Sequence, residues 1–145
     1  MSNFLFTRVG HNYIPTNNID QSIEWYTKYL GLKLVSKFMD RGSYLAVLHY
    51  PHQNAIATLL IETSELTPLE INRNGVAFPI TAINCEDIEY TYEQMQNSGV
   101  KIEGELTTLG DEEAKYFYFR DDVGNLLEAT WSIWDPKDEV KETFK

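Results

Sequence analysis

The sequence predicts an α+β fold that is built from two similar βαβββ modules. An amphipathic helix pattern occurs twice, and each helix pattern follows one strand-like run and precedes three others. The residues that can cap the two helices, Asn18 and Asp87, are 69 positions apart (87 − 18 = 69). An open sheet with a helix on one face needs a partner for its other face, so we expect paired modules within one domain.

The first helix is predicted over residues 19–30 and the second over residues 87–98. In each, apolar residues recur at helical spacing and form one stripe, and a glycine follows, Gly31 in the first case and Gly99 in the second. The stripe of the first helix is Ile19, Ile23, Tyr26 and Leu30, and that of the second is Ile88, Tyr92 and Met95. We expect each helix to pack on its sheet through these side chains.

Strand-like runs complete the two modules. Those of the first half are VGHNYIPT before the helix and LKLVSKF, SYLAVLHY and AIATLLIET after it; those of the second half are VAFPITAIN before the helix and VKIEGEL, KYFYFR and NLLEATW after it. We expect a single domain over residues 1–134, with modules at 5–66 and 75–134 that are joined by ELTPLEINRNG. Residues 135–145 are charged and are expected to form a polar tail.

The composition argues against several function classes. With 22 acidic and 12 basic residues the net charge is −10, whereas nucleic-acid binding relies on Lys and Arg to neutralise phosphates. No apolar run is long enough to span a bilayer, and the first residues lack the pattern of a signal peptide. One cysteine, Cys85, excludes an internal disulfide and is typical of a cytoplasmic protein. We therefore expect no nucleic-acid or membrane partner.

Glu128 stands out because it lies in a nearly all-apolar run, NLLEATW. A buried carboxylate loses its hydration and needs a cation or several hydrogen-bond donors to compensate. Side chains alternate along a strand, so His11 and Tyr13 share one face of the first strand, and Glu128 and Thr130 share one face of the last. Superposing the two helix starts places Ile80 at the position that corresponds to His11 (11 + 69 = 80).

Two motifs connect the chain to a known family. The opening motif is a His on the first strand, then a helix start, a Ser, an aromatic pair and Leu-Gly, which here are His11, Asn18, Ser22, Trp25-Tyr26 and Leu30-Gly31. The closing motif is DDVGNLLE, which ends at Glu128 and has Asp122 where the family has Pro. With these motifs, residues 5–134 resemble the glyoxalase, bleomycin-resistance and ring-cleaving (extradiol) dioxygenase superfamily, also called vicinal oxygen chelate.

The resemblance implies a cup-shaped mixed sheet made from the paired modules, with a site inside the cup. In metal-using members, one position on each of strands one, four, five and eight binds a divalent ion. His11 matches the first of these positions and Glu128 the last, whereas the fifth-strand position corresponds to Ile80, which cannot bind a metal. The fourth-strand position is either Glu62 or Leu60. The implied cofactor is a divalent metal (Zn, Mn, Fe, Ni or Co) with His11, Glu62 and Glu128 as ligands.

Two function classes follow from this resemblance. One is a metal-dependent lyase, isomerase, thiol transferase or dioxygenase, in which the ion polarises a substrate oxygen and Glu128 acts as the catalytic carboxylate that moves a proton. The other is a metal-free protein that binds and sequesters a small compound, as the drug-resistance members do. In that case His11 and Glu128 would pair across the cup, and the acidic net charge favours a cationic, aromatic ligand.

Aromatic side chains can stack on a planar ligand in either class. The candidate ligand-binding residues are Tyr13, Tyr44, Ile80, Tyr118 and Trp131, with Trp134 as a further ring. Residues 116–119 are all aromatic, so alternation should turn one pair of rings to the cup and the other to the helix. Because two-fold dimers are the commonest soluble assembly, we expect a homodimer that binds a small molecule.

Overall fold

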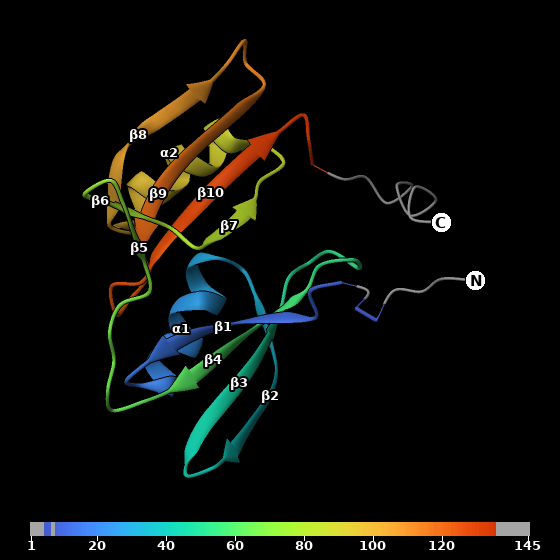
Figure 1. The fold of residues 1–145 in the computed structure, drawn as a ribbon, viewed down its shortest axis with the longest axis vertical. Coiled ribbons are helices and arrows are strands. Elements are labelled where there is room, and N and C mark those ends of the chain that lie inside the picture. The colour runs from blue at the N-terminus through green and yellow to red at the C-terminus, as the bar shows by residue number, and fades with distance from the viewer. Residues whose placement is uncertain (1–4, 7, 136–145) are drawn as a thin grey trace.

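The computed structural model describes residues 5–6 and 8–135 (Figure 1), so most of the polar tail predicted at 135–145 lies outside the described residues. The described chain forms two βαβββ modules, which confirms the α+β fold class and the paired modules. The first module contains β1 (His11–Thr16), α1 (Ile19–Tyr29), β2 (Lys33–Asp40), β3 (Ser43–His49) and β4 (Ala57–Glu62). The second contains β7 (Thr81–Asn84), α2 (Ile88–Ser98), β8 (Ile102–Leu109), β9 (Ala114–Arg120) and β10 (Leu126–Ser132).

Each module has its own four-stranded mixed sheet. The strand order is β1-β4-β3-β2 in the first sheet and β7-β10-β9-β8 in the second. The first and last strands of each module pair in parallel, and the other neighbours pair antiparallel. Positions 69 residues apart therefore occupy equivalent places. Asn12 and Thr81 are such a pair, and Asn12 Nδ2 donates a hydrogen bond of 3.3 Å to Thr81 Oγ1, so the modules meet at equivalent positions.

Capping residues set the helix boundaries. The side-chain oxygens of Asn18 and Asp87 each accept a hydrogen bond of 3.1 Å from the backbone N–H three residues on. Helix α2 ends at Gly99, whose φ of +89° lies in the left-handed region that glycine adopts readily. The predicted ranges, 19–30 and 87–98, agree with the observed helices to within one residue at each end. Among the described residues, neither helix is long and apolar enough to cross a membrane.

A β-hairpin that was not predicted from the sequence joins the modules. Its strands, β5 (Ile71–Arg73) and β6 (Val76–Phe78), pair antiparallel. Asn74 and Gly75, with φ of +54° and +86°, form the tight turn between them, and Asn-Gly is the residue pair that such turns favour. Pro79 follows β6 and has no N–H to donate, so the expected continuous strand is interrupted before β7.

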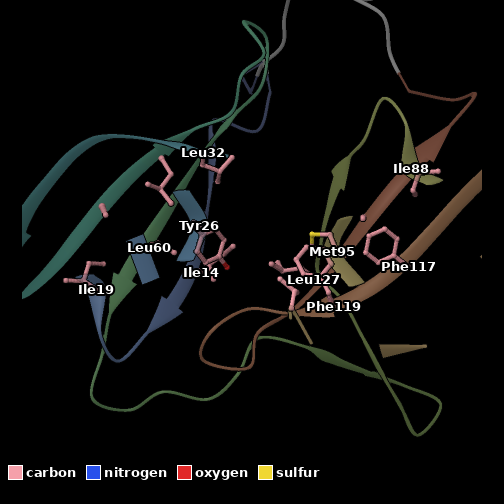
Figure 2. Packing of buried hydrophobic residues seen from close by; sticks show 14 residues of the cluster. Ile14, Ile19, Tyr26, Leu32, Leu60, Ile88, Met95, Phe117, Phe119 and Leu127 are labelled. Atoms are coloured by element: carbon pink, nitrogen blue, oxygen red, sulfur yellow. The ribbon is translucent and has the colours of Figure 1, made fainter. Parts of the chain in front are cut away.

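The helix-covered faces of the two sheets share one hydrophobic core (Figure 2). It is one cluster that contains Ile14, Ile19, Tyr26, Leu32, Ala46, Leu48 and Leu60 from the first module and Ile88, Met95, Val100, Phe117, Phe119, Leu127 and Ala129 from the second. The rings of Trp25 in α1 and Phe119 in β9 stack with centroids 6.5 Å apart. Because each sheet turns its covered face to this core, its open face lies on the side away from the core.

The loop between β9 and β10 fastens the modules together through Asp121, whose carboxylate is buried. Its Oδ1 accepts from the backbone N–H groups of Val123 and Asn125 at 3.0 and 2.9 Å, and its Oδ2 accepts from Asn125 Nδ2 at 2.8 Å. The fourth donor is the hydroxyl of Tyr26 in α1, at 2.6 Å. Burial and the neighbouring Asp121 raise the pKa of Tyr26, so this hydroxyl keeps its proton and remains a donor.

Asn125 extends this contact to two more segments. The side chain is fully buried, and its Nδ2 also donates to the carbonyl oxygen of Pro15 in β1 at 2.9 Å. Its Oδ1 accepts from the backbone N–H of Leu69, in the segment between the modules, at 2.7 Å. Helix α1, strand β1 and the linking segment therefore all depend on one loop of the second module.

Asp122, which stands where the family has proline, has a less complete set of partners. Its Oδ2 accepts from Ser22 Oγ at 2.8 Å and from Gln21 Nε2 at 3.0 Å, both in α1. Its Oδ1 is buried and has no hydrogen-bond partner among the described residues. An unsatisfied buried oxygen costs free energy, so the contact of Asp122 with α1 is offset in part by its own burial.

Replacing Tyr26 by Phe should lower the free energy of unfolding by about 1–3 kcal/mol, because Asp121 Oδ2 loses a donor at a buried position. Tyr29→Phe is the matched control, since Tyr29 lies in the same helix and its hydroxyl makes no hydrogen bond among the described residues. Urea unfolding of both variants measures the difference. Equal effects of the two substitutions would contradict this account of the contact between the modules.

Candidate small-molecule site

Glu128 lies on the open face of the second sheet. Its neighbours along β10, Leu127 and Ala129, are buried on the covered face, so Glu128 points to the opposite side. The side chain is half-buried. Burial raises the pKa of Glu128, and the side chain of Thr130 acts in the opposite direction. No cationic side chain of the described residues pairs with Glu128, so Thr130 compensates for its burial only in part.

Aromatic rings line the β9 side of Glu128 on this face. Tyr118 in β9 is its direct cross-strand neighbour. The ring of Tyr118 lies 5.4 Å from that of Tyr116 and 6.1 Å from that of Phe78, which comes from the hairpin. Burial raises the pKa of Tyr118, and the negative charge of Glu128 raises it further. The phenol therefore stays protonated, and the face offers rings, a hydroxyl donor and a carboxylate acceptor side by side.

His11 lies on the open face of the other sheet. Its Nε2 lies 3.1 Å from the hydroxyl of Tyr13, and the two rings meet edge to face with centroids 5.0 Å apart. The strand beside it contributes Ala57 and Leu59, which are apolar. In the described part of the chain, no hydrogen bond or ion pair joins His11 to Glu128, and each lies on the side of its sheet that faces away from the shared core.

Glu62 lies on the covered face rather than the open one, which corrects the expected grouping with His11 and Glu128. It follows Leu60 by two residues in β4, and Leu60 is fully buried in the core. The Oε2 atom accepts a hydrogen bond of 3.2 Å from the backbone N–H of Ile19, at the start of α1. A carboxylate at a helix N-terminus satisfies an unpaired N–H and interacts favourably with the helix dipole, so Glu62 has a structural role.

The residues at the family's metal positions do not fit a metal ion. The open face of β4 presents Leu59 and Ile61, and Ile80 occupies the fifth-strand position, so only His11 and Glu128 could be ligands. Structural and catalytic sites for transition metals use three or four protein ligands. Among the described residues, no group of three or more His, Cys, Asp or Glu side chains is placed to hold a metal ion.

The structure separates the predicted ligand-binding residues into two groups. Tyr13, Ile80 and Tyr118 lie on or beside the open faces, and Ile80 is 53% exposed. Tyr44 instead lies on the covered side, where Lys37 Nζ is 4.5 Å from its ring centroid and pairs with Asp20 of α1. Trp131 also has the parity of the covered face and packs against the shared core. Tyr44 and Trp131 therefore lie on the side of their sheets opposite to the open faces.

Sequence reasoning missed Phe78 and Arg73, which the hairpin brings to the open face of the second sheet. Arg73 Cζ lies 5.0 Å from the ring centroid of Phe78. The Asn74-Gly75 pair was the available signal, because it predicts a hairpin turn and hence a change of direction between these residues. Tyr116 was expected from alternation alone, as one ring of the pair that faces away from the helix.

Two grooves occur on the molecule, and the second borders this face, because its lining includes Glu103, the cross-strand neighbour of Tyr118. One, of about 280 Å³, lies at the loop between β3 and β4 and is lined by His49, Tyr50, His52, Gln53, Ala55 and Ile56. The other, of about 400 Å³, lies beside the loop that contains Asp121 and is lined mainly by charged residues. Neither contains Glu128 or Tyr118, so the candidate site is an open, aromatic surface rather than an enclosed cavity.

The family model described as glyoxalase/bleomycin resistance protein/dioxygenase superfamily matches residues 8–129, which is most of the chain and includes both motifs. The chain belongs to this superfamily. No curated protein matches the chain.

Several solved structures share the fold of this chain at low sequence identity. UcmS2 has a TM-score of 0.69 at 18% identity, over 87% of this chain and 98% of that chain. TnmS3, an antibiotic binding protein from Streptomyces sp. CB03234, has a TM-score of 0.69 at 13% identity, over 90% and 99%. A point mutant of glyoxalase I from Zea mays has a TM-score of 0.67 at 21% identity, over 85% of this chain and 44% of that chain. These identities establish the fold alone.

Replacing Glu128 by Gln should remove a pH-dependent part of the stability. An acid whose pKa is raised on folding holds its proton more tightly in the folded state, so its stabilising contribution exists at acidic pH and is lost as the pH rises through the folded pKa. Urea unfolding of wild type and variant between about pH 4 and pH 7 should show the wild type losing stability relative to the variant as the pH increases. A constant difference over this range would contradict a half-buried, only partly compensated carboxylate.

Proposed function

We propose that this superfamily member binds a small planar ligand without a metal ion. The ligand lies on the open face of the second sheet, stacks on Tyr116 and Tyr118, and places a cationic or hydrogen-bond-donating group at Glu128. The observation that carries the proposal is the half-buried carboxylate of Glu128, which sits among rings and has no cationic partner among the described residues. A bound cation would compensate for its lost hydration and would be attracted by the ring faces.

The comparisons support a binding function of this kind. TnmS3 is an antibiotic binding protein, and this chain has the same fold over nearly its whole length. The net charge of −10 also favours a cationic ligand over an anionic one, because the field of the whole protein attracts positive charge. We infer a ligand that is aromatic, flat and positively charged at one end.

A metal-dependent enzyme is the second candidate, since His11 and Glu128 stand at family ligand positions and the fold is shared with glyoxalase I from Zea mays. The weakness of this candidate is the identity of the other two positions. The fifth-strand position is Ile80, and the open face of β4 offers Leu59 and Ile61, all of which are apolar. A second copy of the chain would bring the same residues, so dimerisation would not add a ligand. Two protein ligands bind a divalent ion too weakly for a resident cofactor.

Binding of proflavine, a planar aromatic cation, can be compared with binding of acridone, a neutral three-ring compound, by quenching of tryptophan fluorescence. We expect Glu128→Gln to weaken proflavine about tenfold, as a charge-assisted hydrogen bond is worth ~1.5–3 kcal/mol, and to change acridone little. Glu24→Gln, which removes the same charge from helix α1, is the control.

The metal content of the purified protein distinguishes the two candidate functions. After dialysis, the protein should contain no stoichiometric divalent metal, and added Zn²⁺ or Ni²⁺ should not alter the affinity for proflavine. Stoichiometric metal that is lost on replacing His11 or Glu128 would overturn the metal-free proposal in favour of the enzyme. Equal affinities of wild type and Glu128→Gln for proflavine would overturn the assigned role of Glu128.

We propose in addition that the protein is a homodimer, because the first sheet leaves apolar residues uncovered. Edge strand β2 exposes Leu34, Val35, Phe38 and Met39, with exposed fractions of 39, 51, 42 and 56%. Contiguous exposed apolar side chains are typical of interaction surfaces, and an exposed edge strand is a further reason for association. A second copy could also bring its His11 face to the Glu128 face of the first, which one chain alone does not do.

Light scattering at micromolar concentration should therefore give twice the chain mass of 16.8 kDa. Val35→Glu places a charge among these exposed apolar side chains and should shift the protein toward monomer, because burying an unpaired carboxylate is costly. Thr27→Glu, which adds the same charge at the surface of α1, is the control. A wild-type mass of one chain would contradict the dimer.

A further inference from the structure

The β5–β6 hairpin forms one wall of the candidate site. In Figure 1 the hairpin lies beside β9, and the edge-to-face contact of Phe78 with Tyr118, at 6.1 Å and 73°, joins the two. Tyr118 in turn is the cross-strand neighbour of Glu128. The segment that connects the modules therefore contributes side chains to the same face as the carboxylate, and it can influence what binds there.

Arg73 is the charged residue that the hairpin brings to this face. Its guanidinium carbon lies 5.0 Å from the ring centroid of Phe78, in a cation–π arrangement. No carboxylate of the described residues pairs with Arg73. By contrast, four other cationic side chains have such partners: Lys37 with Asp20, Arg41 with Asp40, Lys115 with Glu89, and Arg120 with Glu70 and Glu103. Lys28, Lys33 and Lys101 also have no such partner among the described residues, so what distinguishes Arg73 is its position on the ring of Phe78 beside the candidate site.

The guanidinium group of Arg73 can bind a carboxylate while it stacks on Phe78. A guanidinium that stacks on a ring still presents its N–H groups at its edge, where they form a fork that matches the two oxygens of a carboxylate. Phe78, on which Arg73 stacks, contacts Tyr118 edge to face, and Glu128 is the cross-strand neighbour of Tyr118, so opposite charges lie near the same ring. The aromatic surface around Tyr118 therefore offers both an acceptor group, Glu128, and a donor group, Arg73.

We propose that Arg73 is a second ligand-binding group and that the ligand is a planar aromatic compound with a carboxylate as well as a cationic amine. The amine binds Glu128, the ring stacks on Tyr118, and the carboxylate binds the guanidinium of Arg73. This inference rests on the proposed function, because it assigns a ligand class to the same face. The inference differs from the proposed function because it adds an anionic group to the ligand, which Glu128 alone would repel.

Three indole compounds test the inference by isothermal titration calorimetry: tryptophan carries both charges, tryptamine carries the amine alone, and indole-3-propionate carries the carboxylate alone. Tryptophan should bind most tightly. Arg73→Gln should weaken tryptophan roughly tenfold, to the affinity of tryptamine, and leave tryptamine unchanged, because a charge-assisted pair is lost only where a carboxylate is present. Arg73→Lys, which keeps the charge but not the fork, should recover part of the loss.

Arg41→Gln is the matched control, since it removes an equal charge from the turn between β2 and β3. The inference is overturned if tryptophan and tryptamine bind equally and Arg73→Gln changes neither, while Glu128→Gln still weakens both; the proposed function would then stand. Absence of binding by all three indoles and by proflavine would overturn the proposed function and the inference together. Melting temperatures of the variants should match wild type, because Arg73 is exposed and lies outside the core.

Discussion

The buried carboxylate of Asp121 is the constraint on which the arrangement of the two modules depends. It accepts four hydrogen bonds, and the donor of one of them, the hydroxyl of Tyr26, belongs to the other module. Burial raises the pKa of Asp121 and the hydrogen bonds lower it, so this group is stable as an anion only while its donors remain in place. Asn125 then links the same loop to β1 and to the connecting segment, which leaves little freedom for one module to rotate on the other.

Local signals predicted most of the fold because they act over a few residues. The caps at Asn18 and Asp87 and the glycine at the end of α2 are readable in sequence, and their hydrogen bonds form within one turn. The connection between the modules was harder to predict. The Asn74-Gly75 pair indicated its hairpin turn. The adjacent strands are only three residues long, however, and such short runs show no clear alternation of apolar and polar side chains.

The direction of a site residue was predictable only where the sequence also showed which face of its strand is buried in the core. The apolar neighbours of Glu128 identify the covered face of β10, so its own direction follows. Parity also relates Glu62 to Leu60, but the first is charged and the second apolar, and nothing in the sequence states which face α1 covers. The backbone N–H of Ile19, far away in sequence, decides this by donating to the carboxylate of Glu62. The direction of Tyr44 was undetermined for the same reason, whereas that of Trp131 followed from alternation with Glu128 along β10.

The separation of the two open faces has a chemical consequence for the second module. Because the covered faces share one core, no described cation of the first module pairs with Glu128, and Arg73 of the hairpin lies near Tyr118 without pairing with Glu128. A direct ion pair would neutralise both groups and would leave an apolar, aromatic surface. Because no ion pair joins the two groups, each can still bind a partner, and a ligand that carries both an amine and a carboxylate can bind both at once while stacking on the ring of Tyr118.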